Sequence, residues 1–284
     1  MIHVWAEAGS CHDGDLAKAR ALVDVAAAAG ATGIKFQYWS NADRLADRRH
    51  VPAVYRELYR RYALPREWLT TLSHDAHAKG LEFLCTAYLP EDVAVVAPYV
   101  DRLKIASFEL RDEALFSACR DVTPKRPLVV STGMATDVEV AIMLDRAFRA
   151  AGDDLTALAC VSAYPAPVEA LNLRWIDWLA KRLEWELPFH GPQVMNARAG
   201  FSDHTGRIST GAWAVLSGAE ALEVHVRLPE SDPSNPDYGH ALDPHDLADY
   251  IVEARLAEQA MGTGVKNVHN SEQEMAQYIV RGDA

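Results

Sequence analysis

Short apolar runs alternate eight times with helix-length segments along this chain, and this alternation constrains the fold more than any other sequence feature. A strand that leads through a helix into the next strand lies parallel to it, because the crossover returns the chain to the same end of the sheet. The order predicts an α/β protein that folds as a single (β/α)8 TIM barrel. The runs predicted as strands span residues 2–8, 32–39, 81–87, 102–107, 127–132, 156–162, a run ending at 202–204, and 221–225.

Segments with apolar residues at helical spacing fill most intervals between the predicted strands. They cover residues 15–29, 66–79, 90–97, 112–120, 137–151, 171–183, 206–218 and 244–261. Two polar segments interrupt the alternation. We interpret residues 40–62 as an inserted loop with a short helix, and residues 184–199 as an irregular insertion. The barrel is therefore predicted over residues 1–262, with a short C-terminal tail in residues 263–284 that is helical near 271–280.

A doubly wound open sheet is the alternative fold for alternating strands and helices. Such sheets usually carry a glycine-rich GxGxxG phosphate loop after their first strand. Here the first strand is followed by Gly-Ser-Cys-His-Asp-Gly at residues 9–14, which does not match that pattern. The barrel is therefore favoured.

The overall composition limits where the protein works and what it binds. A formal net charge of −12 argues against a general nucleic-acid surface or an anionic membrane as a partner. No apolar run is long enough to span a bilayer, and the N-terminus lacks the features of a secretory signal. The four cysteines form no CxxC pair, which is typical of reduced thiols. We therefore predict a cytoplasmic protein.

The carboxyl ends of the predicted strands carry most of the polar side chains that could do chemistry. In a (β/α)8 barrel these ends meet at one face, where active sites form. Two lysines on inward strands, surrounded by hydroxyl groups, suit a ligand with a carboxylate and a phosphate. The residues at these ends are Glu7, Lys35, Gln37, Thr86, Lys104, Ser107, Glu109, Ser131, Thr132, Ser162, Tyr164, Ser202, Asp203, His204, Glu223 and His225.

Two histidines, His204 and His225, close the last two predicted strands. In a parallel unit they lie at the same edge of the sheet, where two imidazoles can hold a divalent ion with open positions for substrate or water. Because two protein ligands alone make a weak site, we expect substrate oxygens to complete the coordination.

Each of these residues also has a structural interpretation. A buried Lys–Glu pair is as often a structural ion pair as a catalytic one, and serine and threonine are common in turns. A histidine at a strand end is more often a hydrogen-bonded core residue than a ligand. The functional interpretation rests on convergence at one edge. The remaining candidates among the histidines are interpreted as loop or exposed-helix residues: His12, His50, His74, His77, His240 and His245.

Short motifs follow one another in a fixed order along nearly the whole chain. They include Gly-Ile-Lys-Phe-Gln at 33–37, Lys-Ile-Ala-Ser-Phe-Glu at 104–109 and Gly-Phe-Ser-Asp-His-Thr at 200–205. The others occupy residues 6–14, 83–86, 131–136, 162–165, 223–225, 236–237 and 242–244. This ordered set resembles the sialic acid synthase family, which includes N-acetylneuraminate, legionaminate and pseudaminate synthases and spore-coat relatives.

The resemblance implies a phosphoenolpyruvate-dependent transferase that forms a C–C bond. Enzymes of this family condense phosphoenolpyruvate with an N-acetylmannosamine-type aldehyde, give a 2-keto-3-deoxy sugar acid and release phosphate. The resemblance also implies a homodimer, and a divalent metal, Mn²⁺ or Mg²⁺, held by His204 and His225.

Carried over by motif, the resemblance implies roles for individual side chains. The carboxylate of phosphoenolpyruvate would be held by Lys35, Thr86, Lys104 and Ser107. Its phosphate would be held by Lys104, Ser131, Ser162 and Ser202. The acceptor sugar would face Gln37, Glu109, Tyr164 and Asp237. The catalytic residues would be Glu109, Lys35 and Glu7, with Glu109 handling protons at the aldehyde or the attacking water.

Three features depart from the family pattern. Family members usually continue into a small antifreeze-like domain that gives an arginine to the sugar site across the dimer, whereas residues 263–284 resemble the linker to that domain. Cys11 stands where asparagine is usual, and Val224 stands where lysine is usual. The sugar half is thus kept less well than the phosphoenolpyruvate half. This favours a different acceptor, a separate antifreeze-like partner chain that replaces the domain, or a lost activity.

Two other functions remain alternatives at this point. A metal-dependent aldolase or lyase on the same barrel would turn over another phosphorylated or 2-oxo acid without loss of phosphate. A non-catalytic binding subunit of a larger synthase would co-purify with that enzyme and show no activity alone. The intact lysines, serines and histidines argue against the second alternative.

Overall fold

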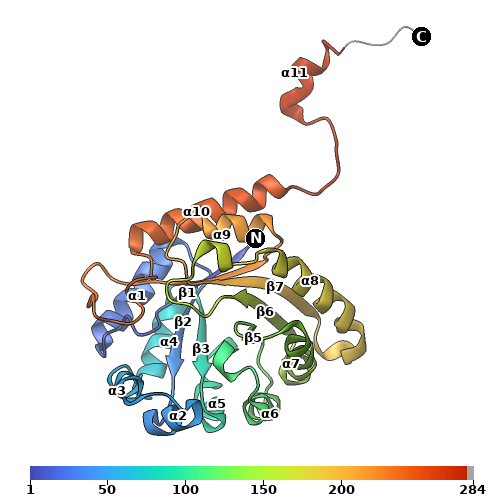
Figure 1. The fold of residues 1–284 in the computed structure, drawn as a ribbon. Helices are drawn as coiled ribbons and strands as arrows, with labels where there is room; N and C mark the ends of the chain where they lie inside the picture. The colour runs from blue at the N-terminus through green and yellow to red at the C-terminus, as the bar shows by residue number, and fades with distance from the viewer. Residues whose placement is uncertain (280–284) are drawn as a thin grey trace.

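The computed structural model, which describes residues 1–279, is a closed barrel of eight parallel strands in sequence order (Figure 1). The pairing of β1 with β8 closes the barrel and sets Glu7 opposite His225. The predicted (β/α)8 fold is confirmed. The strands are β1 (His3–Glu7), β2 (Gly33–Tyr38), β3 (Glu82–Ala87), β4 (Arg102–Ile105), β5 (Leu128–Ser131), β6 (Asp154–Cys160), β7 (Asn196–Asp203) and β8 (Ala221–His225).

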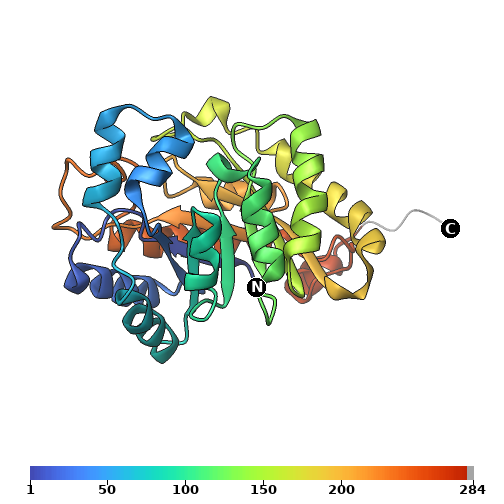
Figure 2. The same cartoon turned by 90° about the horizontal axis from the view of Figure 1, so that it is seen from below.

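Helices surround the strands on the outside of the barrel (Figures 1 and 2). Several begin at a capping side chain, such as Asp15, whose carboxylate accepts a hydrogen bond from Ala17 N. Their buried faces pack against the outer side of the strands in one large hydrophobic core. The helices after successive strands are α1 (Leu16–Ala29), α4 (Trp68–Ala78), α5 (Pro90–Val96), α6 (Glu113–Asp121), α7 (Asp137–Ala150), α8 (Arg174–Glu186), α9 (Thr210–Leu216) and α10 (Pro244–Met261).

The interior of the barrel changes from apolar to polar along the strands. A cluster of fully buried side chains fills its lower part: Trp5, Leu84, Val129, Leu158 and Ala221. Successive side chains of a strand point to opposite faces, so the residue two positions further on points to the same interior. Those following residues are Glu7, Thr86, Ser131, Cys160 and Glu223. The apolar cluster is therefore the floor on which the polar groups lie at the carboxyl ends of the strands.

Residues 40–62 are more regular than the loop and short helix predicted for them. Arg56 forms ion pairs with Asp43 and Asp47, and these contacts join the two helices of the segment. A separate apolar cluster anchors the segment beside the barrel, formed by Trp39, Leu45, Tyr62, Tyr88 and Leu89. The two helices are α2 (Ala42–Arg49) and α3 (Ala53–Arg61).

The segment predicted as an irregular insertion, residues 184–199, also differs from the prediction. Helix α8 continues to Glu186, and β7 already begins at Asn196, because Asn196 pairs with Asp154 at the start of β6. Arg198 of β7 reinforces this pairing through an ion pair with Asp154. The sixth strand accordingly begins at Asp154 and ends earlier than predicted.

Beyond α10 the chain leaves the barrel and carries one short helix, α11 (Gln273–Ala276), away from it (Figure 1). The predicted helical stretch near 271–280 is therefore shorter than expected. The last part of the predicted tail, residues 280–284, lies outside the described residues.

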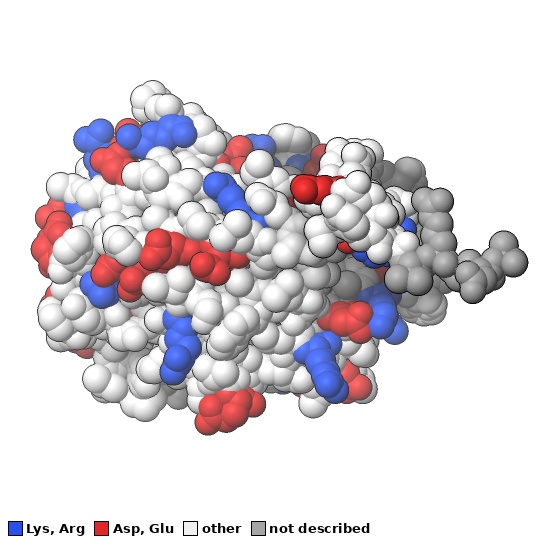
Figure 3. Space-filling view, turned by 90° about the horizontal axis from the view of Figure 1, so that it is seen from above, with Lys and Arg blue, Asp and Glu red and all other residues white. Residues whose placement is uncertain are grey.

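The surface carries charges of both signs. On the face drawn in Figure 3, basic and acidic side chains stand in small separate groups between uncharged residues. None of the helices within residues 1–279 is long and apolar enough to cross a lipid bilayer.

Candidate active site

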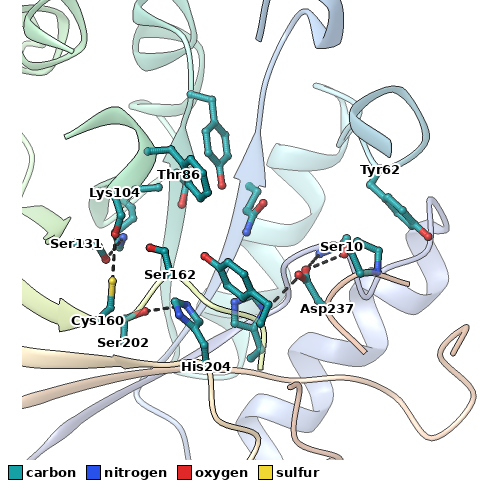
Figure 4. Close-up of a pocket in the computed structure, with 18 of the residues that line it drawn as sticks. Ser10, Tyr62, Thr86, Lys104, Ser131, Cys160, Ser162, Ser202, His204 and Asp237 are labelled. Carbon is teal, nitrogen blue, oxygen red and sulfur yellow. Dashed lines mark hydrogen bonds and ion pairs between the residues drawn. The ribbon is translucent and has the colours of Figure 1, made fainter. Parts of the chain in front are cut away.

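A cavity of about 580 Å³ opens at the carboxyl ends of the strands, where the sequence predicts the active site (Figure 4). Lys104 and Ser131 lie at one end of the view, and Asp237 and Tyr62 lie at the other. Two predicted residues, Glu7 and Glu109, are buried behind the lining rather than in it. The predicted residues that line the cavity are Lys35, Gln37, Thr86, Lys104, Ser107, Ser131, Ser162, Tyr164, Ser202, His204, His225 and Asp237.

Lys35 is the centre of a buried charge network at the floor of the cavity. Its Nζ lies 2.5 Å from Glu7 Oε2 and 3.6 Å from Glu223 Oε2. It also donates a 3.2 Å hydrogen bond to Thr86 Oγ1. Burial by itself lowers the pKa of Lys35, but Glu223 and Glu7 outweigh burial and raise the pKa above its ordinary value. The ammonium group is therefore kept charged by its partners.

The two carboxylates of this network differ in their affinity for a proton. Burial raises the pKa of Glu7 to about 7, against the attraction of Lys35. Burial also favours the neutral form of Glu223, but Lys104 and Lys35 together lower its pKa to about 2. At neutral pH Glu223 stays ionised, whereas Glu7 can both give and take a proton.

Lys104 is the second buried lysine of the site. Its Nζ donates a 2.6 Å hydrogen bond to Ser131 Oγ and a 3.1 Å hydrogen bond to Ile105 O. Burial lowers the pKa of Lys104, although Glu223 acts in the opposite direction. An anionic ligand at this position would restore the full preference for the ammonium form.

A cluster of hydroxyl and thiol groups lies beside Lys104. Ser107 Oγ accepts a 3.0 Å hydrogen bond from Gly133 N and lies 3.1 Å from Cys160 Sγ. Ser162 Oγ is buried and forms no hydrogen bond with any other part of residues 1–279. Gly133 allows this convergence, because a Cβ atom there would lie 2.5 Å from Ser162 Oγ and 2.8 Å from Cys160 Sγ. Converging hydroxyl donors next to an ammonium group suit a phosphate or a carboxylate.

The two predicted metal ligands lie side by side, with the ring centroids of His204 and His225 5.5 Å apart. His204 Nδ1 lies 2.8 Å from Val161 O, so this nitrogen donates and leaves the lone pair on Nε2, 3.4 Å from Ser202 Oγ. Burial lowers the pKa of both histidines to about 4, so both rings are neutral at pH 7. Neutral imidazoles are the form that binds metals, and the pair therefore fits a divalent ion.

A third histidine, His240, stands next to this pair, although the sequence was interpreted as placing it in an ordinary loop. Its ring centroid lies 4.5 Å from that of His225 and 6.0 Å from that of His204. Asp237 lies close to two of the rings, with Oδ2 3.8 Å from His225 Nδ1 and Oδ1 3.8 Å from His240 Nε2. The signal that could have found His240 is its spacing, three residues after the predicted site residue Asp237.

The loop after β1 holds Asp237 in place. Ser10 donates to Asp237 Oδ2 twice, from its backbone N and from Oγ, both at 2.7 Å. Gly9 has a φ of 50°, and a Cβ atom there would lie 2.3 Å from Asp237 Oδ2. Glycine is therefore required where the first loop approaches the last one.

The part of the cavity next to α2 and α3 is built by residues that the sequence analysis did not single out. Arg49 Nε donates a 2.8 Å hydrogen bond to Glu109 Oε1, and Arg49 Nη1 donates a 3.0 Å bond to Tyr59 OH. The guanidinium lies 4.8 Å from the ring centroid of Tyr88 and 4.6 Å from that of Phe108. The aromatic lining consists of Trp39, Tyr55, Tyr59, Tyr62, Tyr88 and Phe108. Tyrosines and arginines at helical spacing in residues 40–62 were the available signal.

Glu109, predicted to handle protons, is fixed by this arginine. Burial raises the pKa of Glu109, against the attraction of Arg49. Its Oε1 accepts from Arg49, while its Oε2 is buried with no hydrogen-bond partner among residues 1–279.

Known proteins resemble this chain in sequence and in fold. The sequence profile of the NeuB family matches residues 22–266. The chain is 32% identical to an N,N'-diacetyllegionaminic acid synthase of Legionella pneumophila, over 95% of this chain and 76% of that protein. It is 30% identical to a pseudaminic acid synthase of Campylobacter jejuni, over 93% of this chain and 76% of that protein. A crystal structure of an N-acetylneuraminic acid synthetase from Leptospira borgpetersenii, in complex with citrate, aligns with a TM-score of 0.80 at 25% identity, over 98% of this chain and 90% of that one.

Proposed function

Because this chain belongs to the NeuB family, we propose that it joins phosphoenolpyruvate to the aldehyde carbon of a sugar and releases inorganic phosphate. The product is a 2-keto-3-deoxy sugar acid, of the nonulosonic type when the acceptor resembles N-acetylmannosamine. The names of the relatives, which are synthases of legionaminic and pseudaminic acid, support this reaction class.

The observation that carries the proposal is the pair of buried lysines, Lys35 and Lys104, placed among hydroxyl groups at the floor of the cavity. Two cationic centres suit a small ligand that is anionic at both ends. The carboxylate would be bound by Lys35, Thr86, Lys104 and Ser107. The phosphate would be bound by Lys104, Ser131, Ser162 and Ser202.

The reaction forms a C–C bond to the aldehyde and a C–O bond to water, and it breaks the C2–O bond to phosphate. C3 of the enol attacks the aldehyde carbon, and the aldehyde oxygen takes up a proton to become a hydroxyl group. Water adds at C2 and loses a proton, and the C2–O bond to phosphate then breaks. Phosphate leaves with that oxygen and takes up the second proton of the water, as the C2 hydroxyl group becomes the ketone. The lysines and hydroxyl groups stabilise the charge that grows on the phosphate, because they are already oriented toward it.

We assign the proton steps to three residues. Glu109 serves the aldehyde oxygen or the attacking water, since burial raises its pKa above the ordinary value of a carboxyl group. Glu7, with a pKa of about 7, exchanges a second proton at the floor of the cavity, and the Lys35 ammonium group 2.5 Å away stabilises its ionised form.

The acceptor sugar would occupy the other part of the cavity, which Gln37, Tyr164 and Asp237 line and behind which Glu109 is buried. His204 and His225 would hold Mn²⁺ or Mg²⁺ beside it. A divalent ion bound there would polarise the aldehyde oxygen and make the carbon more electrophilic.

The test is release of inorganic phosphate from phosphoenolpyruvate with Mn²⁺ and a panel of aldoses that includes N-acetylmannosamine. We expect release that depends on the aldose, together with a product whose mass equals the aldose plus a pyruvate unit. The control omits the aldose and should release no phosphate. Binding of phosphoenolpyruvate without release for any acceptor would contradict the proposal, and turnover without phosphate loss would indicate an aldolase or lyase instead.

A further inference from the structure

We propose that the acceptor is a 6-deoxy sugar, rather than one with a hydroxyl or phosphate group at C6, and that Tyr55, Leu58 and Phe108 bind its C6 methyl group. This inference rests on the proposed function, because it names the chemical class of the acceptor that enters the same cavity. It assigns the choice of acceptor to an apolar wall at the cavity mouth.

The depth of the cavity determines which end of the acceptor meets this wall. The aldehyde carbon must reach phosphoenolpyruvate beside Lys35 and Lys104, which are 3% and 2% exposed at the cavity floor. Tyr55 and Phe108 line the same cavity but are 49% and 51% exposed, so they lie at its mouth. A hexose whose aldehyde carbon is at the floor therefore directs its other end, which is C6, toward the mouth.

One face of helix α3 forms the larger part of the wall. Its residues Tyr55, Leu58, Tyr59 and Tyr62 follow one another at helical spacing, and all four line the cavity. The hydroxyl group of Tyr62 points away from the other labelled side chains in Figure 4. The charged residues of the helix lie at other positions, so this face offers the acceptor rings and an aliphatic side chain instead of charges.

Polar side chains next to this face bond to one another. Trp39 Nε1 donates a 2.9 Å hydrogen bond to Tyr59 O, and Tyr59 OH accepts a 3.0 Å bond from Arg49. Leu58 and Phe108 have no polar side-chain atoms to offer. A C6 hydroxyl group placed against them would lose its hydrogen bonds to water and gain none, whereas a methyl group would be favourably buried.

A phosphate group at C6 would find no free positive charge at the mouth. Every arginine of α2 and α3 already forms an ion pair with a carboxylate. A bound phosphate would have to displace one of these carboxylates, which leaves one anion without a partner. The pairs are Arg44 with Glu91, Arg48 with Asp112, Arg49 with Glu109, Arg56 and Arg60 with Asp43, and Arg61 with Asp232.

The test compares three acceptors that differ only at C6: N-acetylmannosamine, its 6-deoxy analogue and its 6-phosphate. Release of phosphate from phosphoenolpyruvate gives kcat/KM for each acceptor. We expect kcat/KM for the 6-deoxy analogue to exceed that for N-acetylmannosamine at least 10-fold, and that for the 6-phosphate at least 100-fold.

A variant of the wall should remove the preference. Leu58→Gln places an amide group where the methyl group would lie, and it should reduce the ratio between the 6-deoxy analogue and N-acetylmannosamine to less than 3-fold. Val54→Gln is the matched control, since Val54 is 63% exposed on the same helix and lies outside the cavity lining. This control should keep the ratio of the unchanged protein. Circular dichroism checks that both variants fold.

Saturation-transfer difference NMR measures the same contact without turnover. With the 6-deoxy analogue and the protein alone, we expect the C6 methyl protons to receive the largest transfer, because Tyr55, Leu58 and Phe108 surround them. Leu58→Gln should lower the transfer to the methyl protons, whereas Val54→Gln should not change it.

Three results would overturn the inference: an equal or higher kcat/KM for N-acetylmannosamine or its 6-phosphate, an unchanged ratio in folded Leu58→Gln, or methyl protons that receive less transfer than the ring protons of the sugar. Failure of the proposed function gives a different result. Methyl transfer as expected, with no phosphate released for any of the three acceptors, contradicts the proposed reaction alone.

Discussion

The two parts of the cavity are built from different parts of the fold. Around Lys35 and Lys104, the side chains come from the ends of barrel strands, whose positions are fixed by backbone hydrogen bonds to both neighbours. Around Arg49, side chains of α2 and α3 meet Tyr88 and Phe108 from the segments after β3 and β4, and Asp237 comes from the loop after β8. Loops and inserted helices can change without altering the barrel. Under the proposed function, binding of phosphoenolpyruvate would depend on the barrel strands, whereas the choice of acceptor would depend on the added segments.

Removal of a buried lysine from the barrel should cause the largest loss of activity with phosphoenolpyruvate. Lys104→Met keeps the length of the side chain but removes a buried ammonium group that bonds to Ser131. We expect kcat/KM for phosphoenolpyruvate to fall roughly 1,000-fold, because a charge-assisted contact to the leaving phosphate is lost. Steady-state phosphate release measures it, and exposed Lys181→Met is the control. If the KM for the acceptor rose as much as the KM for phosphoenolpyruvate, the assignment of Lys104 to phosphoenolpyruvate would be contradicted.

A smaller effect on the use of phosphoenolpyruvate should follow from crowding the cluster of hydroxyl and thiol groups next to Lys104. In Gly133→Ala, the new Cβ atom would meet Ser162 Oγ and Cys160 Sγ at less than 3 Å, so these groups must move apart. We expect the KM for phosphoenolpyruvate to rise roughly 50-fold, at a cost of about 2 kcal/mol. The KM for the acceptor should stay within twofold. If both KM values rise together, the cluster is shared by the two substrates and the contrast between the two parts fails.

The acceptor part is tested by Arg49→Lys. Lysine keeps the charge but cannot bond to Glu109 and Tyr59 while it lies on the rings of Tyr88 and Phe108. We expect the acceptor KM to rise roughly 10-fold with little change for phosphoenolpyruvate.

The neighbouring Arg48→Lys is the matched control, because Arg48 pairs with Asp112 outside the cavity lining. Equal effects of the two changes would show that a general disturbance of α2, rather than loss of the contact with Glu109, is what matters. An effect of Arg49→Lys confined to phosphoenolpyruvate would reverse the assignment of the two parts.

The last prediction concerns how the stability of the protein depends on pH through His12, in the loop that supports Asp237. His12 Nδ1 accepts a 3.1 Å hydrogen bond from Gly14 N, and burial lowers the pKa of His12 from 6.5 to about 4. Between these two values the unfolded chain binds more protons at this position than the folded chain. Stability must therefore fall as the pH decreases from about 6.5 toward 4.

His12→Asn keeps an acceptor for Gly14 N but cannot be protonated in this range. Urea unfolding at pH 7 and pH 4.5 should show that the variant loses roughly 2 kcal/mol less stability than the unchanged protein over this interval. Equal losses would mean that His12 is protonated in the folded state, or that other groups dominate the acid sensitivity.

The difference between the two parts of the cavity also explains which of its residues could be predicted from the sequence. Alternation of strands and helices fixed the barrel, and the two-residue period of a strand fixed which side chains face its interior, so Lys35 and Lys104 were found. The position of Arg49 depends on packing against Tyr88 and Phe108, which follow other strands. Such contacts between distant segments leave no periodic signal.

His240 was missed for the same physical reason. Its significance lies in the neighbouring ring of His225 and in the carboxylate of Asp237, which Ser10 of the first loop holds in place. Sequence position alone made it an ordinary loop residue. Glu7 and Glu109 lie next to the cavity but behind its lining, because Lys35 and Arg49 cover their carboxylates.

The most direct measurement follows the oxygen atom between C2 and phosphorus. Phosphoenolpyruvate labelled with ¹⁸O at this bridging position is turned over with the best acceptor and Mn²⁺, and both products are analysed by mass spectrometry. The account predicts that the label appears in inorganic phosphate and that the sugar acid carries none from the substrate. Unlabelled phosphate together with labelled pyruvate, and no sugar acid, would contradict it, because that result describes simple hydrolysis at phosphorus.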